Sequence, residues 1–193
     1  MPIDIGERLR GLPTGSAVAL KIDPREYADH YFAVLNATLR DVGSETNAHT
    51  IYVAVTNPAA FVWTLAQALD VPIDRISFVD AISHIMMNYA NPLPNATYVE
   101  SPRALEEIML RVEYLLRKYP HPRSIVVIDS VNSLAIHNPP ELLSEFFHIL
   151  LNNLKSRSVL TLVLETVEEE QTGVEQMLNL VVDETIDVAR AGR

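Results

Sequence analysis

The feature that most constrains the fold is an alternation of short apolar runs with helical patterns along nearly the whole chain. Continuous apolar runs are typical of strands in a parallel sheet, because such strands are buried on both faces. Strands that alternate with helices predict an α/β fold, here a three-layer αβα sandwich with a mostly parallel central sheet. The predicted strands are Ser16–Ile22, Thr50–Thr56, Ile76–Asp80, Ser124–Asp129, Ser158–Leu164 and Leu180–Val188.

Amphipathic helices are predicted between these strands, from apolar residues three and four positions apart. Ser101-Pro102 and Pro139-Pro140 are start signals for two of them. The segment from Ala81 to Glu100 shows no clear period, and we expect a long loop that is either functional or an insertion covering the sheet edge. The predicted helices run from Tyr27 to near Gly43, from Phe61 to Leu69, from Leu105 to Tyr119 and from Leu143 to Leu154.

Size and composition limit the classes of protein that this chain can belong to. A length of 193 residues suits a single domain, residues 1–193, and 48% hydrophobic residues exclude a disordered chain. A net charge of −10 without a basic cluster argues against nucleic acid as a main partner, since phosphate neutralisation dominates such binding. Cysteine is absent, which excludes a thiolate zinc site. With no signal-peptide pattern and no apolar stretch of about 20 residues, we expect a cytoplasmic protein without a membrane partner.

Polar residues follow four of the predicted strands, at the edge where a parallel sheet binds its ligands. They are Asp23, Thr56-Asn57, Asp129-Ser130 and Glu165. Asp129 ends the run Ile125-Val-Val-Ile-Asp-Ser130, and an acid in that place is typical of an aspartate that coordinates Mg²⁺ in phosphoryl transfer. The pattern has a structural alternative as well, because many buried strands end in an acid that caps the next turn.

The order and spacing of several stretches resemble RecA-like ATPases of the KaiC type. The resemblance covers roughly residues 11–188 and implies a RecA-like, P-loop NTPase fold. Such domains assemble side by side around the nucleotide, and members are often assigned to signal transduction. The matching stretches are Gly11–Ser16, Ile76–Ser83, Tyr98–Ile108, Ile125–Leu134 and Glu145–Glu165.

The segment after the first strand departs from the phosphate-binding loop of that family. The family carries Gly-x-Pro-Gly-x-Gly-Lys-Thr, whereas this chain reads Asp23-Pro-Arg-Glu-Tyr-Ala-Asp-His30. Aligned on the proline, Arg25 and Tyr27 stand at glycine positions, Ala28 at the lysine and Asp29 at the threonine. Glycines let backbone amides approach phosphate oxygens and the lysine offsets their charge, so we expect a degenerate Walker A motif and no ATP or Mg²⁺ cofactor.

Two further parts of the ATPase site also differ from what the resemblance implies. At the end of the second strand the family carries adjacent glutamates, one of which activates water, whereas this chain has Thr56-Asn57. Neither side chain accepts a proton at neutral pH. After Val188 only a short C-terminus follows, without the family's terminal strands, although Arg190 could replace one of their cations. We therefore expect no catalytic residue, with Asp129 and Ser130 as a vestigial Walker B motif.

The predicted function is that of a pseudo-ATPase, a non-hydrolysing regulatory or scaffolding protein that acts through protein contacts. Those contacts are expected at the former nucleotide face, the segment from Ala81 to Glu100, or the side edges of the domain. The expected assembly is a homo-oligomer or a complex with an active paralogue.

The alternative is an enzyme that binds ATP or a divalent metal at a remodelled site around Asp129, Glu165 and Asp23, with Asn57 and Lys21 as polar partners. An enzyme needs these side chains to converge around a pocket, and a binding module does not.

Other residues with chemical potential carry weaker signals. The histidines show no metal-ligand spacing, so no metal site is predicted from them, and His148 is expected to be a packed or half-exposed residue of a helix. Trp63 is expected to pack in the core or at a subunit interface. Glu165 and Glu168-Glu-Glu170 form an acidic strip that we expect to be a solvated loop.

Overall fold

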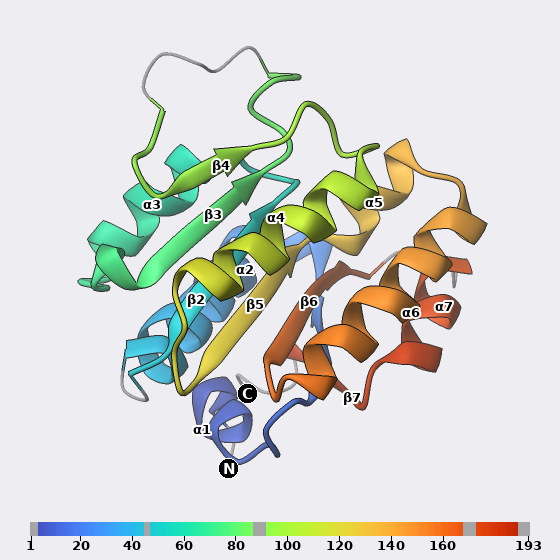
Figure 1. Ribbon diagram of the computed structural model, residues 1–193. Helices are drawn as coiled ribbons and strands as arrows, with labels where there is room; N and C mark the ends of the chain where they lie inside the picture. Colours follow the sequence, from blue (N-terminus) through green and yellow to red (C-terminus); the bar gives the residue numbers. More distant parts are fainter. Residues whose placement is uncertain (1–3, 45–46, 87–91, 168–172, 189–193) are drawn as a thin grey trace.

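The central sheet is parallel throughout the part of the chain that the structure describes. The computed structural model describes residues 4–44, 47–86, 92–167 and 173–188, and it forms a seven-stranded sheet in the order β4-β3-β2-β5-β6-β1-β7 (Figure 1). The strands are β1 (Ala17–Ile22), β2 (His49–Ala54), β3 (Ile76–Asp80), β4 (Ala96–Tyr98), β5 (Ser124–Asp129), β6 (Leu160–Thr166) and β7 (Glu184–Asp187).

Helices cover both faces of the sheet, which confirms the predicted three-layer α/β fold (Figure 1). One layer consists of α1 (Ile5–Arg10), the short 3-10 turn η1 (Pro24–Glu26), α2 (Tyr27–Leu35), the π-helical η2 (Asn36–Ser44), α3 (Ala59–Ala68) and the 3-10 turn η3 (Ile73–Arg75). The other consists of α4 (Leu105–Lys118), α5 (Val131–His137), α6 (Pro140–Ser156) and α7 (Gly173–Val181). Among the described helices, none has the length and apolar character needed to cross a bilayer.

The alternation of side chains along each strand decides which helical layer a residue meets. On β5, Ile125 and Val127 belong to the core beneath α2 and α3, whereas Val126 and Ile128 belong to the core beneath α4 and α6. Asp129 therefore points to the α2 and α3 side. At the carboxyl end of β6 the alternation places Glu165 on the other face of the sheet, on the side of α5 and α7.

The segment from residue 81 to residue 100 contains a strand that the sequence did not predict. Ala96–Tyr98 form β4, which pairs in parallel with β3 in the register Phe78 to Ala96 and Asp80 to Tyr98. Three residues are too few to produce a readable alternation, so periodicity could not reveal this edge strand. Residues 87–91 of the predicted loop lie outside the described structure.

The predicted strand Leu180–Val188 is wrong at its beginning. Leu180 and Val181 belong to α7, and β7 comprises only Glu184–Asp187. The chain leaves the helix at Asp183, whose backbone N–H donates to the carbonyl of Ala17 at 2.8 Å and whose carboxylate accepts the N–H of Ala17 at 2.9 Å. The strand β7 begins after these two hydrogen bonds. Because apolar residues lie on both sides of Asp183, the sequence pattern does not show where the helix ends and the strand begins.

Candidate functional site

In the segment after β1, three backbone N–H groups donate hydrogen bonds to acceptors within the segment itself. The side chain of Asp23 accepts the N–H of Arg25 at 2.9 Å, and its carbonyl accepts the N–H of Glu26 at 3.2 Å. The N–H of Asp23 donates to Nδ1 of His30 at 3.2 Å. The result is one 3-10 turn that leads directly into α2, with Arg25, Ala28 and Asp29 on the surface. This stretch is therefore a helix entry.

The first turns of α2 place two tyrosines over the carboxyl edge of the sheet. The rings of Tyr27 and Tyr31 stack with centroids 5.4 Å apart and planes inclined by 11°. Burial and the charge of Asp129 raise the pKa of Tyr27 to about 12. The side chain of Asn57 interacts with both hydroxyls and lowers the pKa of each tyrosine. Asn57 therefore lies close to both tyrosine hydroxyls.

Asp129 is completely enclosed by two tyrosines. Its Oδ2 atom accepts hydrogen bonds from the hydroxyl of Tyr31 at 2.7 Å and from the hydroxyl of Tyr52 at 2.6 Å. The two hydroxyls are 3.0 Å apart, and the side chain of Asp129 is 0% exposed. The carboxylate of Asp129 is thus out of contact with solvent, and its Oδ2 atom is engaged by both hydroxyls.

The electrostatics of this group follow from its burial. Loss of solvent raises the pKa of Asp129, and the hydrogen bonds from Tyr52 and Tyr31 oppose that rise. Thr56 lies near enough to lower the pKa as well, although Oδ1 makes no hydrogen bond of ordinary geometry within the described residues. Burial and the charge of Asp129 also raise the pKa of Tyr31 and Tyr52, so both tyrosines are neutral donors.

A cluster of hydroxyl groups occupies the place expected for the base that activates water. Oγ1 of Thr56 lies 2.7 Å from Oγ of Ser133 and 3.2 Å from Oγ of Ser130. Oγ of Ser130 also accepts the N–H of Ser133 at 3.3 Å and so caps α5. Hydroxyls of this kind do not accept a proton at neutral pH, so the cluster offers no general base.

The side chains required for the alternative metal site do not converge. Glu165 is buried on the opposite face of the sheet from Asp129, and Asp23 caps the turn η1. Lys21 forms an ion pair with Glu175 of α7. In the described ranges, no three histidine or acidic side chains are arranged to hold a metal ion. The acidic strip Glu168-Glu-Glu170 and Arg190 lie outside the described residues.

Three residues of this site carry roles that the sequence pattern does not reveal. The pattern places Tyr31 only in a helix, Tyr52 only in an apolar strand and Asp80 only at a strand end. Asp80 is 0% exposed and accepts the N–H of Ala59 at 2.8 Å and both the N–H and the hydroxyl of Ser83, at 2.8 and 2.6 Å. A polar-tipped residue inside an apolar strand, as at Tyr52, is the one signal that the sequence offers.

The structure also shows where two other residues of the sequence analysis lie. Trp63 is partly buried, and its ring lies 6.4 Å from that of Phe78, which agrees with core packing. His148 lies on the exposed side of α6 and not in the packed interface.

Comparisons with known proteins agree with this fold. The family model of the KaiC ATPase matches residues 41–191. A crystal structure of a KaiC-like protein from the hyperthermophilic archaeon Pyrococcus horikoshii is similar, with a TM-score of 0.59 and 13% identity over 87% of this chain and 69% of the other. No curated protein matches the sequence. Since the family model covers more than half of the chain, the protein belongs to the KaiC ATPase family.

Proposed function

We propose that this protein is a non-hydrolysing member of the KaiC family, a pseudo-ATPase that regulates or scaffolds other proteins. The observation that carries the proposal is the pair of hydrogen bonds from Tyr31 and Tyr52 to Oδ2 of Asp129. An aspartate that serves Mg²⁺ must present its oxygen to the metal. Here Oδ2 already has two neutral donors, and the whole carboxylate, including Oδ1, is shielded from solvent.

The free energy needed to open this site argues against nucleotide binding. Each hydrogen bond to a charged group contributes about 1.5–3 kcal/mol, so release of both costs roughly 3–6 kcal/mol before any ligand is bound. The segment Asp23–His30 offers no lysine in return, and the N–H groups of Asp23, Arg25 and Glu26 already have acceptors. The family match begins at residue 41, after this segment, which supports the view that the departure from the family is concentrated here.

A role in protein contacts fits what the chain retains. The parallel sheet, both helical layers and the buried strand ends are intact, whereas the hydroxyl cluster at Thr56 has no base. A domain of this shape presents surfaces to partners without chemistry. We infer an assembly with itself or with an active paralogue, and a role in signal transduction of the kind that the family resemblance implies.

Calorimetry with ATP and ADP in the presence of Mg²⁺ tests the proposal directly. We expect no heat of binding at nucleotide concentrations up to about 1 mM, a level that excludes affinities stronger than about −4 kcal/mol. Micromolar binding of either nucleotide would contradict the proposal. A phosphate-release assay on the same preparation, with Asp129→Ala as the control, separates hydrolysis by this chain from a contaminating ATPase.

A further inference from the structure

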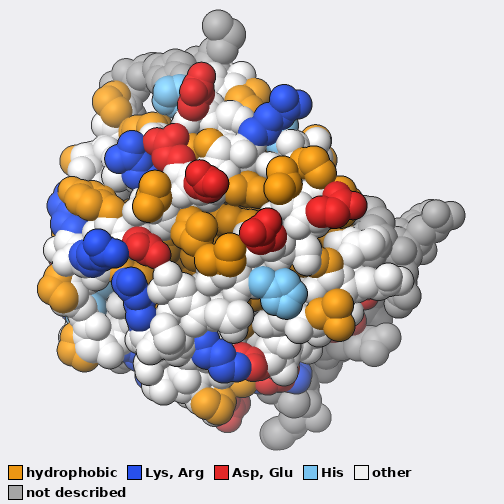
Figure 2. Space-filling view, turned by 45° about the vertical axis from the view of Figure 1, so that its right-hand side comes forward, with side chains coloured by type: hydrophobic (Ala, Val, Ile, Leu, Met, Phe, Trp, Pro, Cys, Tyr) orange, Lys and Arg blue, Asp and Glu red, His pale blue; other side chains and the backbone are white. Residues whose placement is uncertain are grey.

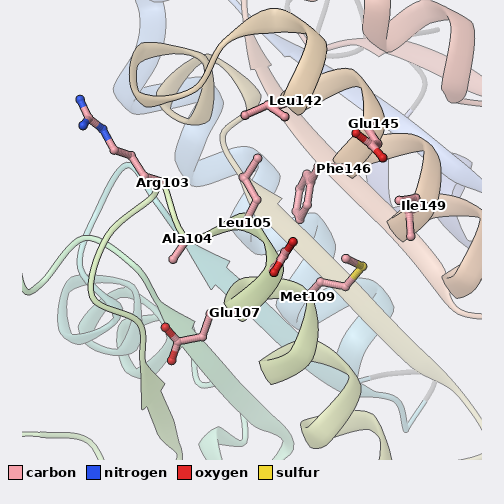
Figure 3. A pocket seen from close by; sticks show the side chains of 10 residues that line it. Arg103, Ala104, Leu105, Glu107, Met109, Leu142, Glu145, Phe146 and Ile149 are labelled. Atoms are coloured by element: carbon pink, nitrogen blue, oxygen red, sulfur yellow. The ribbon is translucent and has the colours of Figure 1, made fainter.

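A groove between α4 and α6 lies on the opposite face of the sheet from Asp129. It has a volume of about 490 Å³, and its lining includes Leu105, Met109, Leu142, Phe146 and Ile149. Figure 3 shows side chains of both helices pointing toward one another across it, with Leu105 and Met109 from α4 opposite Phe146 and Ile149 from α6. The groove is closed toward the C-terminal ends of the helices, where Asn153 of α6 donates to Glu113 of α4 at 2.7 Å.

Large apolar side chains at the groove are exposed to solvent. Leu142 is 54% exposed and Ile149 is 48% exposed, although both belong to α6, a helix that contributes many residues to the core beneath α4 and α6. Leu110 of α4 is also exposed, at 64%. Figure 2 shows hydrophobic side chains gathered in the middle of this face, bordered by acidic side chains and, toward the left, by Lys and Arg side chains as well. A contiguous apolar patch with a polar border is typical of a protein-binding surface.

The charges at the groove have one predominant sign. Glu106 on α4 and Glu145 on α6 line opposite walls, and neither forms an ion pair with another described residue. Glu107 also lines the groove but is neutralised by Arg111 at 3.0 Å. Arg103, just before α4, is the one cation among the lining residues. The walls are therefore acidic where they face a ligand in the middle of the groove.

We propose that this groove binds one amphipathic helix of a partner protein, with apolar side chains in the groove and lysine or arginine on both flanks. Recognition of a helix in a groove uses apolar anchors at positions i, i+3 or i+4, and i+7. Leu142 and Ile149 are seven residues apart on α6, about 10 Å along the axis, which is the same span as i to i+7 on a partner helix. Glu106 and Glu145 pair with the basic flanks.

Charge excludes two other occupants. A second copy of the chain placed across a two-fold axis would bring these glutamates against the same acidic surface, and each chain carries a net charge of −10. An anionic membrane surface is repelled for the same reason. The inference rests on the proposed function, since it names the class of partner that a protein-binding module would take.

The test is selection of helical peptides from a displayed library on the wild-type protein. We expect enriched sequences with three apolar anchors flanked by lysine or arginine. A peptide from that set should bind the double variant Glu106→Lys, Glu145→Lys at least about tenfold more weakly. The control variant Glu7→Lys, Asp74→Lys changes the net charge by the same amount on exposed acids outside the groove and should bind normally.

Leu142→Ala and Ile149→Ala extend the test without risk to the core, because both side chains are half exposed. Each should weaken the selected peptide by about tenfold. Failure to enrich any helical sequence, enrichment of acidic or extended peptides, or equal binding to both double variants would overturn the inference. Nucleotide calorimetry tests a different surface from peptide selection. If no helical peptide binds and ATP does not bind either, the groove proposal is refuted and the proposed function stands. If ATP binds and a basic helical peptide also binds the groove, the proposed function is refuted and the groove proposal stands.

Discussion

Removal of the tyrosine hydroxyls that cover Asp129 is the most direct perturbation of the candidate site. Tyr31→Phe and Tyr52→Phe each delete one oxygen atom and keep the ring. Tyr31 is 4% exposed and Tyr52 is 0% exposed, so the rings remain packed. The deleted oxygens are 2.7 and 2.6 Å from Oδ2 of Asp129, distances typical of strong hydrogen bonds to an ionised acceptor.

Each substitution should lower the free energy of unfolding by about 1.5–3 kcal/mol, the range for hydrogen bonds to charged groups. The loss should depend on pH. When Asp129 is protonated its need for donors falls, so each substitution should cost only about 1 kcal/mol at a pH below the pKa of that group in the folded protein. The cost should grow as the pH rises through that pKa, which burial has raised.

The assay is urea denaturation of both variants and the double variant, at about pH 5 and about pH 8. Tyr114→Phe serves as the control, since Tyr114 is 50% exposed on α4. The two hydroxyls share one acceptor and touch each other, so the double variant should deviate from additivity by at least about 0.5 kcal/mol. Variants that match Tyr114→Phe at both pH values would refute the claim that these hydroxyls hold a buried carboxylate.

Three further predictions concern the same strand ends. Asp129→Asn should remove a pH dependence of stability. The folded protein binds the proton of Asp129 more tightly than the unfolded chain, so the free energy of unfolding of the wild type falls as the pH rises from about 4 through the raised pKa, by about 1.4 kcal/mol for each pH unit that separates the folded from the unfolded pKa. In urea titrations the variant should therefore gain stability relative to the wild type over that range. Asp80→Ala should cost at least about 3 kcal/mol in the same assay, because it orphans the N–H groups of Ala59 and Ser83 in the interior, whereas the exposed Asp74→Ala should cost less than about 1 kcal/mol. Addition of Mg²⁺ with ATP should leave the midpoint of thermal unfolding unchanged, while a shift that rises with the logarithm of nucleotide concentration would reveal binding to the folded state.

The parts of the fold that the sequence could predict are those whose physics is local. Ile76–Asp80 and Ser124–Asp129 have the predicted bounds, because strands buried on both faces are apolar throughout and end at a polar residue. The amphipathic period also located α4 and α6 to within a few residues. The junction of α7 and β7 could not be predicted, because it is set by contacts of Asp183 with Ala17, which lies 166 residues away.

The candidate site was only partly predictable for the same reason. The absence of glycines and of a lysine after β1 is visible in the sequence, and so is the acid at the end of β5. The partners of that acid are not, because Tyr31 and Tyr52 come from two other elements and meet Asp129 only through the order of the strands. A tyrosine in an apolar strand is compatible with many environments, and topology alone selects one.

The turn after β1 and the hydrogen bonds to Asp129 are physically connected. Asp23 caps a single 3-10 turn after β1, and α2 begins at Tyr27. Tyr31, one turn further along α2, lies over the end of β5, where its hydroxyl donates to Asp129. A buried carboxylate without a cation must find hydrogen-bond donors, and two neutral hydroxyls meet that need without introducing a second charge. The turn after β1 and the burial of Asp129 are therefore parts of one arrangement, in which α2 supplies a neutral hydrogen-bond donor to the buried acid.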